Sequence, residues 1–266
     1  MIIKHDKELK ELLAAVTWLE NIIATWPTYE RKEFYYTFNR RLEALHLVMK
    51  YCKRGSTIFD IGAGQGFHSL ILKKIGYNII AVDIDDRYAH FLRKNGVKFY
   101  KADIEHDLLP FDEVDCILFT EVIEHFIEHL KPSRVPIVLS KFYSILKSKG
   151  VLIITTPNAK SIGKLMKRLA GKPVIPHIHI KEYTMKELTS LLHKAGFKLL
   201  LTRFSLSTYL NPRKARNIVN YKGTVMAELF RTPHLENLAQ AIILPIAILL
   251  PSLRGSFVLV AQKEGT

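Results

Sequence analysis

Cysteine is scarce in this chain, which has only Cys52 and Cys116 among its 266 residues. Two cysteines cannot build the disulfide framework of a small secreted protein, and no leader pattern precedes them. We therefore expect two ordinary buried thiols in a protein of the reducing cytoplasm.

An apolar run of membrane-spanning length is also missing. The best candidate, LAQAIILPIAILLP at 238–251, contains two prolines and is shorter than the roughly 20 residues that cross a bilayer. Three interpretations stand beside each other: a buried segment, which is the default, an apolar wall beside a substrate, or a piece that enters a membrane surface.

Acidic residues are few relative to basic ones. Lys and Arg number 39 against 25 Asp and Glu, and residues 159–255 alone hold 16 basic and 4 acidic residues. A basic region of this kind attracts nucleic acid, an anionic membrane or an anionic small substrate. A lysine-rich surface that only provides solubility, as in thermophile proteins, would carry the same charge.

The order of apolar runs predicts an α/β fold. Two helices are expected first, at 7–26 and 29–52, because apolar residues recur there at helical spacing. Short strands then alternate with amphipathic helices, which is typical of a mainly parallel sheet with helices on both faces. The strands are expected at 56–62, 77–85, 97–104, 114–122, 151–158, 197–205 and 256–264, and the helices at 68–76, 87–96, 132–150 and 185–197.

Some fifty residues separate the last two predicted strands, too many for a hairpin. We therefore expect three parts: a helical segment at 1–54, a core made of 55–205 and 256–264, and a basic and apolar helical cap at 206–255.

The stretch IFDIGAGQGFHSLIL, residues 58–72, follows a predicted strand and opens a predicted helix. Its glycines, Gly62, Gly64 and Gly66, permit a tight turn and let a ligand lie against the main chain, where the amides of the helix start face it. The spacing differs from the dinucleotide fingerprint, whose third glycine comes one residue later.

Acidic residues follow at the tips of the next two strands. Asp83 is placed to accept both hydroxyls of a ribose, and Asp103 with Ile104 to hold the edge and face of an adenine. Together with the glycine stretch, this order predicts an adenosine-type ligand. Carboxylates that only cap helices are the alternative.

Over 55–205 and the last strand, these motifs make the chain resemble class I S-adenosylmethionine-dependent methyltransferases. The resemblance implies a Rossmann-like seven-stranded sheet, mainly parallel, with an antiparallel last strand. It also implies that Gly62, Gly64 and Gly66 line the methionine part of the donor, that Asp60 reaches its amino end through water, and that Asp83, Asp103 and Ile104 hold the ribose and adenine. Because the sulfonium is already activated, the enzyme mainly has to align and deprotonate the acceptor.

A second motif, TEVIEH, ends the fourth predicted strand. Glu121, Glu124 and His125 have spacings that place them on one side of a helical turn at the active end of the sheet. They can bind a hard divalent cation, serve as a base with its orienting group, or be an acid cluster favoured by the helix dipole. In the resembled family, the residue at Glu121 often contacts the methionine of the donor.

The motif is similar to that of ubiquinone-type O-methyltransferases and of small-RNA 3′-end 2′-O-methyltransferases. In the RNA family, a Glu-x-x-Glu-His set and a distant histidine hold magnesium, and here the stretch PHIHIKEYT offers His177 or, better aligned, His179. The resemblance to the RNA family thus implies Glu121, Glu124, His125 and His179 as ligands of Mg²⁺. Without a metal, His179 is a candidate base, and Glu124, His125 and His179 are the groups expected to position and deprotonate the acceptor. A histidine that only shapes the pocket is the third interpretation of His179.

The chain departs from the RNA pattern at two points. Ile178 replaces an aspartate between the two histidines, and residues 181–184 replace an aromatic run. His129, one helical turn beyond His125, is interpreted as a solvated helix residue outside the site.

The basic segments suggest a partner. Residues 163–172 combine Leu165, Met166 and Leu169 with cations, a pattern suited to an anionic membrane surface. Residues 211–217 can meet phosphates of RNA or of a phosphorylated lipid carrier. Few aromatic residues that could stack on bases accompany them, namely Tyr209, Tyr221 and Phe230.

Cations beside an apolar wall favour a lipid-like acceptor over nucleic acid. We therefore expect a cytoplasmic protein, peripheral to the membrane if the cap binds lipid, that methylates an oxygen of a small-molecule, glycolipid or quinone-like acceptor. The alternatives are a magnesium-dependent RNA 3′-terminal 2′-O-methyltransferase and a scaffold that binds S-adenosylmethionine without catalysis.

Overall fold

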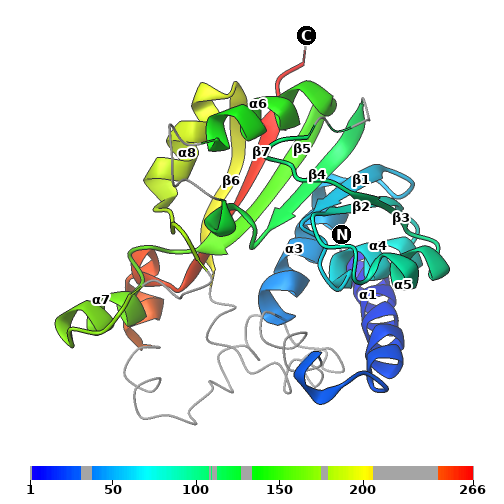
Figure 1. The fold of residues 1–266 in the computed structure, drawn as a ribbon, viewed down its shortest axis with the longest axis horizontal. Helices are drawn as coiled ribbons and strands as arrows, with labels where there is room; N and C mark the ends of the chain where they lie inside the picture. The colour runs from blue at the N-terminus through cyan, green and yellow to red at the C-terminus, as the bar shows by residue number, and fades with distance from the viewer. Residues whose placement is uncertain are drawn as a thin grey trace.

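A computed structural model describes residues 2–30, 38–107, 109, 113–126, 134–174, 179–205 and 245–265. These residues form a seven-stranded sheet in the order β3-β2-β1-β4-β5-β7-β6 (Figure 1), in which β7 runs antiparallel to both neighbours. The strands are β1 (Thr57–Ile61), β2 (Asn78–Asp83), β3 (Lys98–Lys101), β4 (Val114–Thr120), β5 (Leu146–Pro157), β6 (Phe197–Ser205) and β7 (Ser256–Lys263). The predicted Rossmann-like fold with an antiparallel last strand is confirmed.

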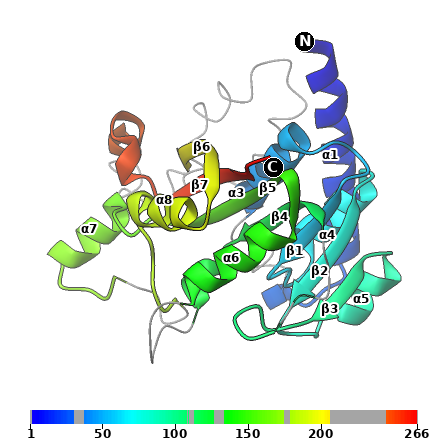
Figure 2. The ribbon, with the colours of Figure 1, turned by 90° about the horizontal axis from the view of Figure 1, so that it is seen from above.

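Helices cover both faces of the sheet (Figure 2). One face packs against α1 (Ile2–Ile23), α3 (Phe38–Tyr51), α4 (Phe67–Lys74) and α5 (Ala89–Lys94), and the other against α6 (Val135–Ile145) and α8 (Met185–Lys194). Helix α7 (Ile162–Leu169) follows the carboxyl end of β5. Two short 3-10 helices, η1 (Ile123–His125) and η3 (Pro251–Leu253), also occur in the described residues.

The strands are apolar on both sides because both faces are buried. In β4, Cys116 and Leu118 face the α1–α3–α4 layer, whereas Ile117 and Phe119 face the α6–α8 layer. Both cysteines are buried and form no disulfide, as expected. Burial raises the pKa of the Cys116 thiol well above its ordinary value, which makes it unreactive.

The predicted helix at 132–150 is wrong at its end, because α6 stops at Ile145 and β5 starts at Leu146. Leu146 is buried and pairs with Val114, and the register then shifts before Val151 pairs with Cys116. Gly150 does not end a helix: a Cβ there would lie 2.8 Å from the carbonyl oxygen of Lys147. This glycine instead permits a bulge in the strand.

Several predicted features fall outside the described residues. Residues 38–51 of the predicted helix at 29–52 form α3, but 31–37 are not described. Residues 206–244 of the cap, which include the basic segment at 211–217 and its neighbouring aromatic residues, are not described either. His129 and His177 also lie outside the described residues. No helix in the described ranges has the length and hydropathy to cross a membrane.

The N-terminal helix α1 shares the core of the sheet. Leu12, Val16, Leu19 and Ile23 are buried in one cluster with residues of α4 and of the central strands. The two tryptophans of the chain, Trp18 and Trp26, lie in this region and pack on the same cluster. Tryptophan fluorescence therefore reports on the N-terminal segment, and far-ultraviolet circular dichroism on the whole fold.

We expect Leu19→Ala to lower the free energy of unfolding by about 2–5 kcal/mol, because Leu19 is fully buried. Urea unfolding followed by fluorescence and by circular dichroism should give coincident transitions in both proteins. The exposed change Thr17→Ala is the matched control and should have little effect. A separate early fluorescence transition would show that α1 unfolds independently of the sheet.

Candidate active site

The predicted site residues gather at the carboxyl edge of the parallel strands. The glycine loop follows β1, Asp83 ends β2, Asp103 follows β3, and Glu121 follows β4. In open α/β sheets, this edge is where ligands bind. A cavity of about 130 Å³ lies there, lined by Arg40, Arg41, Gly62, Ala63, Gly64, Phe67, His68, Thr120, Glu121 and Thr155.

The three loop glycines all have positive φ, but they differ in what surrounds them. A Cβ on Gly62 would lie 2.2 Å from Val122, and one on Gly66 would lie 2.2 Å from Leu92. A Cβ on Gly64 would meet nothing within 4 Å. Packing therefore accounts for the first and third glycines, whereas the middle one leaves main chain open toward space beside the cavity.

Asp60 is almost fully buried beneath this loop. Its Oδ2 accepts hydrogen bonds from the amide and the hydroxyl of Ser69, at 3.1 and 2.6 Å. Burial raises the pKa of Asp60 to about 6, although the Ser69 hydrogen bonds act in the opposite direction. The carboxyl group thus fixes the start of α4 relative to β1.

The two acids at the next strand tips both make local hydrogen bonds. Asp83 Oδ2 accepts from the Gly64 amide at 2.7 Å, so it supports the glycine loop. Asp103 accepts from the Glu105 amide at 2.9 Å and contacts His106 Nδ1 at 2.7 Å. Each carboxylate oxygen has two lone pairs, so these contacts leave room for a ligand hydroxyl or amine.

Glu121 has a left-handed backbone with φ of 56° and faces the cavity. Its Oε1 accepts a hydrogen bond from Thr155 Oγ1 at 2.9 Å, and its Oε2 pairs with the guanidinium of Arg40. Sequence reasoning missed Arg40 and Arg41. They lie in an amphipathic helix about eighty residues away, and no local pattern shows that they reach the glycine loop.

His68 was also missed, although it directly follows the glycine loop. Its side chain is buried in the cavity wall, and its Nε2 atom has no hydrogen-bond partner. Burial, reinforced by the nearby Arg41, lowers the pKa of His68 to about 3. The imidazole is therefore neutral, and its Nε2 stays buried without a hydrogen-bond partner beside the cavity.

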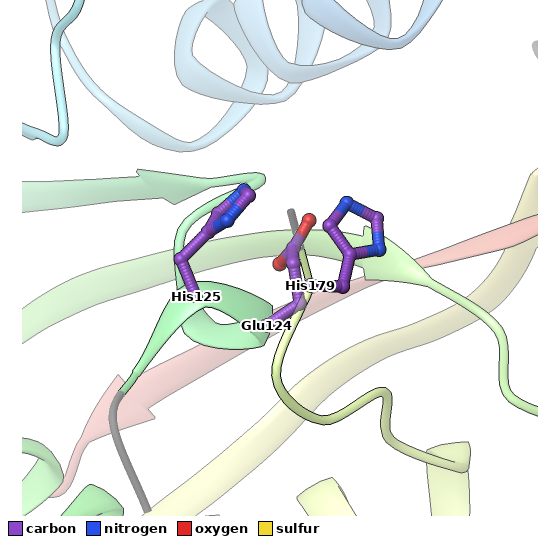
Figure 3. Close-up of side chains that lie close together, drawn as sticks. All are labelled: Glu124, His125 and His179. Atoms are coloured by element: carbon purple, nitrogen blue, oxygen red, sulfur yellow. The ribbon is translucent and has the colours of Figure 1, made fainter. Parts of the chain in front are cut away.

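Glu124, His125 and His179 form a second group, whose ligand atoms all lie within 4.8 Å of one another. Figure 3 shows the three side chains extending to the same side, the first two from η1 and His179 from the loop before α8. The rings of His125 and His179 are 5.0 Å apart and nearly perpendicular. Glu121, the fourth predicted metal ligand, is not in this group.

The Glu124 side chain is almost completely buried. Its Oε2 accepts from Thr156 Oγ1 at 2.9 Å, whereas its Oε1 has no partner. Burial, with a smaller contribution from the nearby Glu121 carboxylate, raises the pKa of Glu124 to about 8. At neutral pH this carboxyl group mostly keeps its proton, so it is a hydrogen-bond donor rather than a base.

A buried relay supports His179. Its Nδ1 lies 2.9 Å from Oε1 of Glu182, and Oε2 of Glu182 pairs with the ammonium of Lys164 on α7. Next to Glu182, the fully buried Tyr183 pairs with Asn158 at the end of β5. This pairing fixes the loop that carries His179. Sequence reasoning did not assign roles to Lys164, which is distant in sequence from His179, or to Glu182, which stands only three residues after it.

A methyltransferase domain family model matches residues 29–202. The ribosomal protein L11 methyltransferase of Campylobacter hominis is 44% identical over 61 residues, which cover 21% of this chain and 20% of that protein. The ubiquinone biosynthesis O-methyltransferase of Bradyrhizobium diazoefficiens is 25% identical over 126 residues, 46% of each chain. The aligned part thus spans less than half the length of either relative.

Among solved structures, an S-adenosylmethionine-dependent methyltransferase from Archaeoglobus fulgidus superimposes with a TM-score of 0.57. It is 22% identical, and the alignment covers 89% of this chain and 100% of that one, so the two share the fold. With a family model that matches well over half of its residues, the chain belongs to the class I S-adenosylmethionine-dependent methyltransferases. Membership of this family implies S-adenosylmethionine as the methyl donor.

The buried carboxyl group of Glu124 should make stability depend on pH. Between about pH 4.5 and 8 it is protonated in the folded protein and ionised in the unfolded chain. Unfolding then releases a proton, so stability falls as pH rises through this range, on the order of 1 kcal/mol per pH unit. We expect Glu124→Gln to reduce this slope in urea titrations, and the exposed control Glu264→Gln to keep it. An unchanged slope in Glu124→Gln would contradict the assignment.

Proposed function

We propose that this methyltransferase transfers the methyl group of S-adenosylmethionine to an oxygen of a small-molecule, glycolipid or quinone-like acceptor. The observation that carries the proposal is a histidine with a buried carboxylate behind it, His179–Glu182, in the group with Glu124 and His125. Thr155 and Thr156, adjacent in β5, bond Glu121 in the cavity and Glu124 in the second group. The Glu121 carboxylate also acts electrostatically on Glu124, so the two parts lie near each other at the carboxyl edge of the sheet.

The cavity suits the amino-acid end of the donor. Arg40 and Glu121 supply one positive and one negative group, which complement the carboxylate and ammonium of a methionine. His68 lines the same cavity, and the open main chain at Gly64 allows close approach of a ligand. We assign donor binding to Asp60, Gly62, Gly64, Gly66, Asp83, Asp103, Ile104 and Glu121.

His179 is the proposed general base. The carboxylate of Glu182 holds its Nδ1, which leaves Nε2 to take the proton of the acceptor hydroxyl. Bound S-adenosylmethionine supplies a methyl group on a sulfonium, whose sulfur leaves as a neutral thioether. An oxygen–methyl bond forms as the sulfur–methyl bond breaks, and the proton passes from His179 to solvent. Glu124 and His125 orient the acceptor hydroxyl.

The second group does not fit magnesium. Mg²⁺ prefers oxygen ligands in octahedral geometry, whereas this group offers two imidazoles and one carboxyl group. The remaining predicted ligand, Glu121, is paired with Arg40. Two imidazoles with a carboxylate suit a softer transition-metal ion better. No step of the proposed reaction passes through magnesium, and a chelator should leave the activity unchanged.

We also propose that three parts of the chain have different roles. Residues 1–54 complete the donor side, since Arg40 reaches Glu121 and Gln65 Nε2 donates to the Glu30 carbonyl at 3.2 Å. Residues 55–205 and 256–264 form the methyltransferase core, and the cap at 206–255 selects the acceptor.

Gly64→Ala should weaken donor binding at least tenfold, because the new methyl group would occupy space beside the cavity where a ligand approaches the main chain. Gly55→Ala is the matched control. Gly55 also has positive φ and open space around its Cβ position, but it lies before β1 at the opposite edge of the sheet. Each change should destabilise the fold by about 1–2 kcal/mol. Titration calorimetry with S-adenosylmethionine measures the difference, and equal affinities in the two variants would contradict the donor assignment.

The acceptor class is tested with methyl-labelled S-adenosylmethionine and an extract of the source cells, separated into organic, small polar, RNA and protein fractions. We expect label in the organic or small polar fraction. His179→Gln should lower transfer by about 10²–10⁴-fold while donor affinity stays unchanged. Label in RNA together with loss of transfer on chelation would establish the magnesium-dependent RNA activity instead. Donor binding without transfer to any fraction would identify a scaffold.

A further inference from the structure

Helix α7 exposes apolar side chains beyond its first turn. Leu165 is 41% exposed, Met166 53% and Leu169 77%, whereas Ile162 at the start of the helix is buried. At about 100° per residue, Leu165, Met166 and Leu169 share one arc of the helix. Lys164, Lys167 and Arg168 occupy the opposite arc, so the helix is strongly amphipathic.

A second exposed apolar segment lies at the same end of the sheet. Ile248 is 37% exposed, Leu249 78% and Leu250 51%. Asn158, just before α7, donates to the carbonyl oxygens of Ser252 and Arg254 at 2.9 and 2.8 Å, which ties the two segments together. In Figures 1 and 2, α7 (green) and the helical turn at 245–249 (orange) both lie at the end of the molecule away from α1.

We propose that α7 and residues 248–250 form a docking surface for an anionic lipid bilayer. Leucine and methionine side chains can enter the acyl boundary, while Lys167 and Arg168 meet anionic headgroups. Lys160 and Lys172 at the two ends of α7 add to the positive charge. An RNA surface would instead call for exposed aromatic residues, which the two described segments lack. Pairing with a second copy would bring like cations together.

The docking surface is held in a fixed relation to the acceptor side. Lys164 points inward from α7, where it pairs with Glu182 and donates to the Asn158 carbonyl oxygen at 3.0 Å. Glu182 in turn contacts His179. A bilayer bound at α7 therefore lies at the same sheet edge as His179, and, if the proposed function holds, the acceptor is carried by the membrane.

The test is sedimentation of the full chain with vesicles of phosphatidylcholine alone and of phosphatidylcholine mixed with an equal amount of phosphatidylglycerol. We expect the mixed vesicles to bind about tenfold or more tightly than the neutral ones, with a loss of binding as salt is raised. The double change Leu165→Gln and Leu169→Gln should weaken binding to the mixed vesicles about tenfold or more. Lys167→Gln with Arg168→Gln should remove most of the preference for anionic lipid.

Matched controls change the same residue types elsewhere. Ile137→Gln replaces an exposed apolar residue on α6, and Lys94→Gln with Lys98→Gln removes two exposed cations near the other end of the sheet. These variants should bind vesicles as the unchanged chain does. Three outcomes would each overturn the proposal. The first is an equal loss of binding in the control and α7 variants, and the second is equal binding to both vesicle types. The third is RNA binding that depends on Lys167 and Arg168, without binding to vesicles. Calorimetry with S-adenosylmethionine tests donor binding separately, so failure of vesicle binding leaves that assignment unaffected.

Discussion

Two adjacent hydroxyl groups at the end of β5 set the arrangement of the whole site. Successive side chains of a strand face opposite sides of a sheet, so Thr155 and Thr156 point in opposite directions. Thr155 bonds Glu121 in the cavity under the glycine loop, and Thr156 bonds Glu124 in the group with the two histidines. A shift of β5 by one residue would move one threonine into the other's position and put Ile154 or Pro157 in the vacated one, so one glutamate would lose its hydroxyl partner. The site therefore depends on the register of the central strands.

That register depends in turn on packing far from the site. Leu152 and Ile154 of β5 face the α6–α8 layer, and Val151 and Ile153 face the layer of α1, α3 and α4. Because all four are buried, either face resists a slip of the strand. The packed strands can therefore hold carboxyl groups at their ends in buried positions that disfavour the ionised form. Asp60 and Glu124 are two such groups, and burial raises the pKa of each.

Features that depend on neighbours in sequence could be predicted, and features that depend on distant residues could not. The glycine loop, Asp83 and Asp103 follow from the alternation of strands and helices, because parallel strands end at one edge. Arg40 and Lys164 reach the site only through the tertiary fold, whereas Glu182 stands three residues after His179 and could have been found from the sequence. The spacing of Glu121 and Glu124 also predicted that they form one cluster on a helical turn. A left-handed residue at Glu121 and a 3-10 turn at 123–125 separate them instead, one toward each side of the sheet.

The opposite directions of Thr155 and Thr156 also affect how the sequence of such a protein can evolve. Residues on the Thr155 side, from Arg40 to Glu121, precede β5 in the chain, whereas Lys164, His179 and Glu182 follow it. Replacement of the segments after β5 can thus alter what stands beside Glu124 while the glycine loop keeps its supports. The strand therefore separates the residues proposed for the donor from those proposed for the acceptor, and the second set can change without rebuilding the first.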